Sequence, residues 1–95
     1  MRNYEILYII APNLDEDATK KTIERFSNIL TDQGAEIVKV DEWGKRRLAY
    51  EINDFGEGYY VVLKVKANPE AINEFDRRVK LNDDIIRTLV VRDDD

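Results

Sequence analysis

Two kinds of hydrophobic spacing follow one another along this chain in a fixed order, and that order limits the folds open to it. Apolar residues alternate with others over 4–10, 59–67 and 85–91, and a longer, more polar run of the same kind spans 38–52. Segments beginning near Asp15 and Asn68 instead repeat apolar residues every three or four positions. The predicted order is strand, helix, strand, strand, helix, strand.

This order predicts an α+β fold of the ferredoxin-like βαββαβ kind. Two right-handed strand–helix–strand units then form a four-stranded antiparallel sheet with two helices on one face, and the opposite face stays open. Residues 1–95 are expected to form a single domain, because half of such a chain would hold too little core. The acidic tail, residues 93–95, shows no packing signal and is expected to be flexible.

The helix boundaries carry local signals. Asp15 is expected to begin the first helix, with acidic residues in its first turn, and Gly34 to end it. Asn68 and Pro69 fit the cap and the first position of the second helix. The apolar stripes that should face the sheet are Ile23, Phe26 and Ile29 or Leu30 in the first helix, and Ile72, Phe75 and Val79 in the second.

The faces of the strands follow from parity. Even positions of 4–10 and odd positions of 59–67 are expected to face the core. In the long strand, Gly44 predicts a bulge or bend, and residues 53–58 (NDFGEG) predict a hairpin turn. The residues of the long strand that share even parity are expected to face the core together: Val38, Val40, Leu48, Tyr50 and Ile52.

Composition excludes several kinds of chemistry. The chain contains no Cys and no His, which removes the common zinc ligands, thiol nucleophiles and imidazole bases. Ser27, its one serine, lies mid-helix, and no glycine-rich phosphate loop follows a strand. We therefore expect no enzymatic activity, no cofactor, no metal and no small-molecule substrate. The absence of a long apolar run predicts a cytoplasmic protein without membrane contact.

A basic segment, WGKRRLAY over 43–50, stands out against a formal net charge of −5. Parity predicts that Lys45 and Arg47 project from the open face while Arg46 points to the helix side. Charge of this kind can protect an edge strand from unwanted pairing. It can also bind phosphate, because the guanidinium fork grips two oxygens, and Trp43 and Tyr60 offer faces for stacking bases.

RNYEILYIIAPNL at the start, GAEIVKVDEWGKRRLAYEI in the middle, GYYVVLKVKA after the turn and DDIIRTLVVRD at the end together resemble the bacterial small-subunit ribosomal protein S6 family. The resemblance covers nearly the whole chain. It implies a structural component of the small subunit, which binds the central domain of small-subunit ribosomal RNA as a heterodimer with the basic ribosomal protein S18. A basic partner also explains how an acidic protein joins an RNA assembly.

The resemblance also implies which residues face the RNA. The RNA-binding candidates are Arg2, Lys45, Arg46 and Arg47. Further candidates for either the partner surface or the RNA surface are Trp43, Tyr60, Lys64 and Lys66. Which of these contact RNA and which contact the partner stays open at this stage.

Two other classes of binding protein remain alternatives. A module like the RNA-recognition motif would stack single-stranded bases on Tyr60 and would need no partner, and GYYVVL partly matches its aromatic third strand. A ligand-sensing regulatory domain on the same fold would bind small metabolites between paired sheets and have no affinity for RNA.

Overall fold

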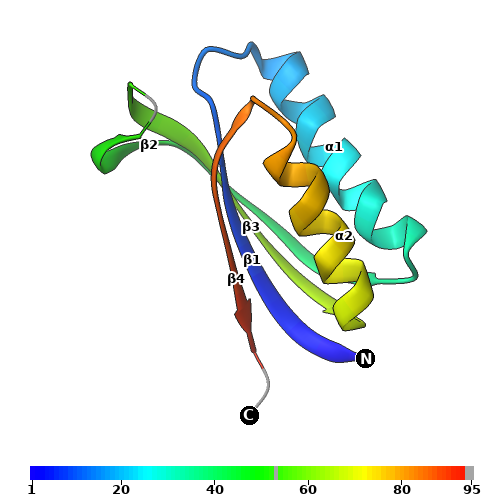
Figure 1. The fold of residues 1–95 in the computed structure, drawn as a ribbon. Coiled ribbons are helices and arrows are strands. Elements are labelled where there is room, and N and C mark those ends of the chain that lie inside the picture. Colours follow the sequence, from blue (N-terminus) through cyan, green and yellow to red (C-terminus); the bar gives the residue numbers. More distant parts are fainter. Residues whose placement is uncertain (53, 94–95) are drawn as a thin grey trace.

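The computed structural model describes residues 1–52 and 54–93, and its elements follow the predicted order (Figure 1). All strand pairs are antiparallel and form one sheet in the order β2-β3-β1-β4, with both helices packed on one face. The predicted ferredoxin-like fold is therefore confirmed. The elements are β1 (Arg2–Ile10), α1 (Glu16–Asp32), β2 (Glu36–Ile52), β3 (Phe55–Ala67), α2 (Pro69–Lys80) and β4 (Ile85–Arg92).

The helices begin where the sequence predicts. The Asp15 carboxylate accepts a hydrogen bond from the backbone N–H of Ala18 at 2.7 Å, which satisfies a donor that the first turn of α1 leaves unpaired. Gly34 follows the end of α1 with φ +84°, a left-handed conformation that glycine adopts without a steric penalty. Pro69 occupies the first turn of α2, after Asn68 in an extended conformation.

The core lies between the sheet and the two helices. Tyr8 of β1, Phe26 of α1 and Phe75 of α2 meet there with ring centroids 5.8 to 6.1 Å apart and their rings tilted or edge to face, an arrangement that aromatic quadrupoles favour. The predicted core faces of β1 and β3 are confirmed. Their fully buried members are Ile6, Tyr8, Ile10, Val61, Leu63, Val65 and Ala67.

The prediction for β2 is wrong, because its even-numbered residues do not share the core face. Val38 is 56% exposed and Tyr50 is 61% exposed. Pairing with β3 slips between Ile37 and Lys39 and again between Glu42 and Gly44, where Gly44 has φ +82°. Each slip inserts a residue, and an inserted residue moves every later side chain to the other face of the sheet.

After Gly44 the even-numbered side chains of β2 therefore lie on the open face, defined here as the sheet face opposite the helices. Leu48 and Ile52 pack there on a second, smaller core. The buried members of this second core are Ile9, Ala11 and Ile86. We call residues 44–52 and 54–58 the hairpin arm, which bends away from the two helices at the upper left of Figure 1.

The hairpin turn is tighter than predicted. β3 already begins at Phe55, which pairs with Ile52, so the predicted turn 53–58 is mostly strand. Asp54 has φ +68°, a conformation that short hairpin turns demand, and residue 53 lies outside the described part of the chain. In the predicted flexible tail, Asp93 donates its backbone N–H to the carbonyl of Asn3 at 2.8 Å, and positions 94 and 95 are outside the description.

Gly58 lies where the hairpin arm meets the second core. A Cβ atom there would stand 2.2 Å from Cγ2 of Ile9, a branched side chain that is itself 4% exposed. We expect Gly58→Ala to reduce the free energy of unfolding by about 1–3 kcal/mol through overpacking. Gly56→Ala is the matched control, because its Cβ would meet nothing within 4 Å. Urea denaturation of both variants measures the difference, and equal stability would contradict the close contact.

The Tyr8 hydroxyl is buried and has no hydrogen-bond partner among the described residues. Burial raises the pKa of this hydroxyl, and the negative charge of Glu42 raises it further. We expect Tyr8→Phe to increase the free energy of unfolding by about 1 kcal/mol, because an unpaired buried polar group is removed. Urea denaturation at neutral pH tests this, with the partly buried Tyr4→Phe as a control that changes little.

The raised pKa of Tyr8 also predicts a dependence on pH. Above pH ~10 an unfolded tyrosine loses its proton while folded Tyr8 keeps it, so the unfolded state binds fewer protons and stability falls as pH rises. Below that range the contribution is fully present. Tyr8→Phe should therefore lose less stability than the unmodified chain between neutral pH and strong alkali. An identical alkaline decline in both proteins would contradict the prediction.

Candidate nucleic-acid and partner interface

Three of the predicted site residues form a layered stack on the open face. The rings of Trp43 and Tyr60 lie nearly parallel, 7° apart, with centroids at 6.1 Å. The guanidinium of Arg46 lies over the Trp43 ring, with Cζ 5.2 Å from its centroid, at a distance where a cation is attracted by the ring face. Trp43 thus contacts both Arg46 and Tyr60, and its side chain stays 44% exposed.

The bulge at Gly44 reverses the predicted directions of the basic triplet. Arg46 lies on the open face. Lys45 instead pairs with Tyr59 of β3, whose side chain packs against the core on the helix side of the sheet. Arg47 follows two positions later on the same side as Lys45, opposite Glu57. The prediction that Lys45 and Arg47 project from the open face is therefore wrong, and its cause is the residue inserted by the bulge.

Lys45 lies in an environment that differs from that of Arg46. It lines a hollow of about 370 Å³ together with Asp15, Glu16 and Lys20 at the start of α1, and with Tyr59 of β3. The carboxylates on this wall offer nearby counter-charges to the ammonium group, so a phosphate would have to compete with them.

Tyr59 is tied to β2 on the same side of the sheet. Its hydroxyl donates a hydrogen bond to Oε1 of Glu42 at 2.8 Å, and this bond raises the pKa of Tyr59, with partial burial adding to the effect. The bond joins strands β2 and β3 just before the bulge.

A second hollow lies in the middle of the open face. It measures about 280 Å³, and we call it the open-face hollow. Its rim holds Arg87 of β4, which donates a hydrogen bond to the Tyr50 hydroxyl at 2.6 Å and lies 5.9 Å from that ring's centroid. This contact links the hairpin arm to the far edge strand. The lining residues are Leu7, Ile9, Tyr60, Arg87 and Leu89.

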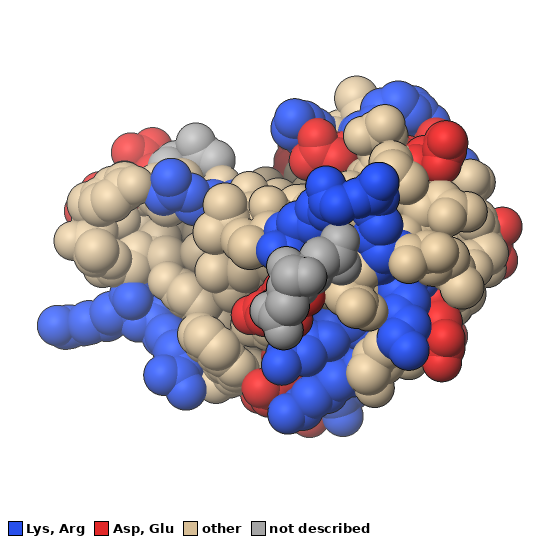
Figure 2. All heavy atoms as spheres, turned by 90° about the horizontal axis from the view of Figure 1, so that it is seen from below, with Lys and Arg blue, Asp and Glu red and all other residues tan. Residues whose placement is uncertain are grey.

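Further cations gather at the other end of the open face. Lys64 and Lys66 of β3 are exposed there, and Lys39 of β2 is the cross-strand neighbour of Lys64. Glu5 and Glu36 pair beside these lysines, so this end is mixed in sign. Figure 2, the view from below, shows Lys and Arg side chains gathered around the end of the molecule where the two termini lie.

Arg2 belongs to this end as well, but not to the open face. It begins β1 and pairs with Ala67, which is fully buried on the helix side. The candidates predicted from the sequence therefore divide into three places: the Arg46–Trp43–Tyr60 stack, the lysines with Arg2 near the termini, and Lys45 with Arg47 on the helix side of the hairpin arm.

Residues that sequence reasoning missed are Tyr50, Leu89, Arg87 and Lys39. Tyr50 was expected in the core because the bulge at Gly44 was not carried into the parity of the strand. Arg87 and Leu89 share odd parity in 85–91, which marks one face of that strand, but the sequence does not show that Arg87 reaches a residue 37 positions away.

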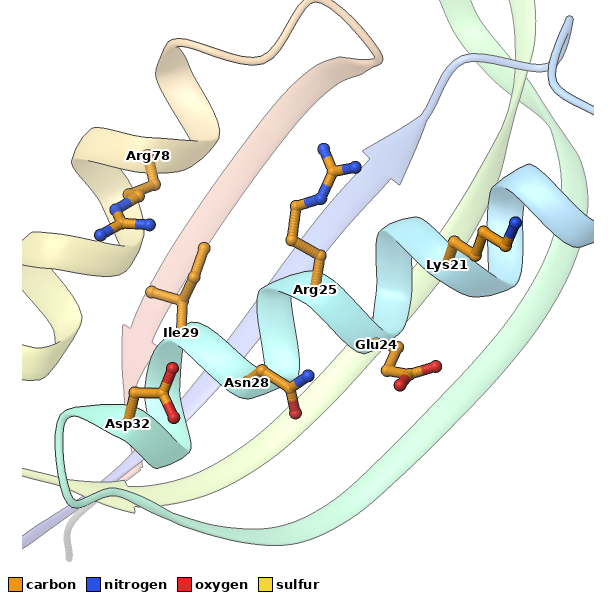
Figure 3. Close-up of a pocket in the computed structure, with 7 residues that line it drawn as sticks. All are labelled: Lys21, Glu24, Arg25, Asn28, Ile29, Asp32 and Arg78. Atoms are coloured by element: carbon orange, nitrogen blue, oxygen red, sulfur yellow. The ribbon is translucent and has the colours of Figure 1, made fainter.

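The helix layer carries a larger hollow, about 490 Å³, that we do not assign to the interface (Figure 3). Its three cations lie beside two acids, Glu24 and Asp32, and Nε of Arg78 already donates a hydrogen bond to Glu74 at 3.0 Å. Hydrogen bonds from Arg77 and then from Arg78 lower the pKa of Glu74, which keeps it charged. The residues that line this hollow of the helix layer are Lys21, Glu24, Arg25, Asn28, Ile29, Asp32 and Arg78.

Residues 1–52 and 54–93 hold no group of three or more acidic, His or Cys side chains placed to bind a metal ion. Within the same part of the chain, neither helix is long and apolar enough to cross a membrane.

Comparisons with known proteins give one consistent result. The sequence model described as ribosomal protein S6 matches residues 3–92. The chain is 66% identical over 94 residues to the small ribosomal subunit protein bS6 of Shouchella clausii, covering 99% of both chains. It is 64% identical over 95 residues to that of Halalkalibacterium halodurans, covering both chains fully.

A solved structure agrees with these relatives. The crystal structure of 30S ribosomal protein S6 from Thermotoga maritima superposes with a TM-score of 0.92 at 34% sequence identity, and the match covers 96% of this chain and 86% of that one. The similarity therefore extends through all six elements of the fold and not only through the basic segment.

The chain's single tryptophan allows the stack to be tested in solution. Arg46→Ala should uncover one face of Trp43 and so increase quenching of its fluorescence by acrylamide, because Arg46 covers that ring. Arg47→Ala is the matched control, since it removes the same charge from the opposite side of the strand. Equal quenching in both variants would contradict the reversed directions after Gly44.

Proposed function

Because the chain belongs to the ribosomal protein S6 family and is a protein of the small ribosomal subunit, we propose that it binds the central domain of small-subunit ribosomal RNA as a heterodimer with ribosomal protein S18. The relatives are structural ribosomal proteins of a family not known for enzymatic activity. The expectation that this chain is not an enzyme is thus confirmed. Its task is to hold RNA and protein together.

The observation that carries the proposal is the composition of the open face. An apolar hollow lies in its middle, and exposed cations lie toward both ends. Apolar surface is buried best by another protein, whereas cations gain most from phosphate. One face that offers both fits a protein docked between a partner and an RNA backbone.

We assign the two kinds of surface accordingly. The open-face hollow and the exposed side chain of Leu89, 55% accessible, receive the protein partner. Arg46 at the hairpin arm and the group of Arg2, Lys64 and Lys66 near the termini reach phosphates beyond its margins. Lys45 and Arg47 contribute from the helix side of the hairpin arm, where a strand of RNA passing the arm would meet both.

Net charge supports the need for a partner. At −5, the whole chain repels a polyanion at long range, even though the open face is rich in cations. A basic protein bound to the open-face hollow would reverse the sign of the combined surface and release counterions from the RNA. Binding should therefore depend on the pair rather than on this chain alone.

The alternative of a partner-free module that stacks single-stranded bases is less well supported. Such a module needs free aromatic faces. Trp43 carries the guanidinium of Arg46 over its ring, and Tyr60 stacks on Trp43. Tyr4 and Tyr8 of β1 face the helix layer. Trp43 and Tyr60 thus already stack on each other, although Trp43 is 44% and Tyr50 is 61% exposed.

The proposal is tested by measuring RNA retention against salt concentration. A fragment of the central domain is incubated with S18 alone, with this chain alone, and with both. We expect the pair to bind more tightly than S18 alone, and this chain alone to bind weakly. If the pair binds no better than S18 alone, the assembly role as stated is wrong.

Substitutions then locate the phosphate contacts. Arg46→Ala should weaken binding by the pair and reduce the slope of log affinity against log salt by about one unit per lost phosphate contact. Arg25→Ala, on the helix layer, removes the same charge away from the proposed surface and should leave the slope unchanged (Figure 3). Equal effects of both variants would place the RNA elsewhere.

A further inference from the structure

The two edges of the sheet differ in how they are protected. β2 carries charged residues along its length, and its pairing is interrupted at three register shifts. β4 is short, and on the open face it carries Arg87 followed by two apolar residues, Leu89 at 55% and Val91 at 50% exposed; its pairing with β1 is regular up to Ile9. Charges and bulges block edge-to-edge pairing, so β2 is blocked and β4 is not.

The hydrogen bonds of β4 show which of its groups face outward. The backbone N–H of Asp93 donates to Asn3 of β1. In an antiparallel ladder such bonds alternate, so the odd-numbered residues of β4 point their backbone groups toward β1. The even-numbered Thr88 and Val90 then turn their N–H and C=O groups away from the sheet, ready to pair with one more strand.

We propose that, in the absence of RNA and partner, two copies of this chain pair antiparallel along β4, with Val90 of each copy facing its equivalent. This register joins the two four-stranded sheets into one continuous sheet and uses the outward groups of Thr88 and Val90. On the open face it sets Leu89 opposite Val91 of the second copy, and Arg87 opposite Asp93 of the second copy.

A second copy is the occupant because β4 is complementary to itself. Antiparallel pairing about a two-fold axis makes each contact away from the axis twice. In this register the contact therefore contains two Arg87–Asp93 pairs, two Leu89–Val91 pairs and one Val90–Val90 pair on the axis, and no charge faces a like charge directly across the strands. Over residues 87–93 the charged and apolar positions thus match those of the same segment read backwards.

The contact is small, so its strength is limited. A single strand pair without a second packed layer falls at the low end of specific interfaces, where association is weak and depends on concentration. The net charge of −5 on each copy opposes it further at low salt. The dimer should therefore form at high protein concentration and should be favoured by moderate salt.

Sedimentation equilibrium of the chain alone tests the proposal, at ~0.15 M salt and over roughly 10 μM to 1 mM protein. We expect a reversible monomer–dimer equilibrium within that range. Leu89→Lys places on β4 the kind of charge that protects β2 and should weaken dimerisation by about tenfold or more. A chain that stays monomeric throughout the range overturns the proposal.

A charge exchange tests the register. Arg87→Glu alone sets two carboxylates opposite each other, and Asp93→Lys alone sets two cations opposite each other, so each should weaken the dimer. The double variant restores opposite charges and should recover most of the lost affinity. Tyr50→Phe is the control, since it removes the intramolecular bond of Arg87 without changing charge and should leave dimerisation intact.

Amide hydrogen exchange locates the contact independently. Protection of the Thr88 and Val90 amides should rise with protein concentration, while amides of β2 stay unchanged. Protection that rises on β2 instead, or a double charge variant that fails to recover, overturns the β4 pairing. These measurements use neither RNA nor S18, so their failure leaves the proposed assembly role unaffected.

Discussion

The arrangement of this molecule depends on the backbone of Gly44, whose φ of +82° suits a residue without a side chain. The part of β2 that precedes Gly44 contributes Ile37 to the core under the helices. After it, the same strand turns its apolar residues to the other face and joins the second core. One strand thereby serves both faces, and the direction of every cation in the basic triplet follows from that single inserted position.

Much of the fold could be predicted because its signals are local or periodic. The helix starts at Asp15 and Pro69, the stop at Gly34 and the core faces of β1 and β3 all depend on neighbouring residues or simple alternation. The faces of β2 could not be predicted in the same way. Gly44 signals a bulge, but a sequence does not show that a second slip at Ile37 precedes it.

The sequence predicts which residues belong to the candidate site better than it predicts where their side chains point. Arg46, Trp43 and Tyr60 were singled out for chemistry, and the structure brings them together in a stack. Lys45 and Arg47 were placed on the wrong face, and Arg87 with Tyr50 was not foreseen, because that contact joins opposite edges of the sheet. Long-range pairing of this kind depends on the tertiary path of the chain, which alternation alone does not encode.

The strand order has a consequence for how the chain is made. β1, the first strand to be synthesised, lies in the interior of the sheet between β3 and β4, and Tyr4 pairs with Arg92 near the other end of the chain. During synthesis β1 can pair with β3 first and pairs with β4 only after that later strand has been made. Until then one side of β1 has no ladder partner, so this side of the strand stays exposed to aggregation until β4 emerges.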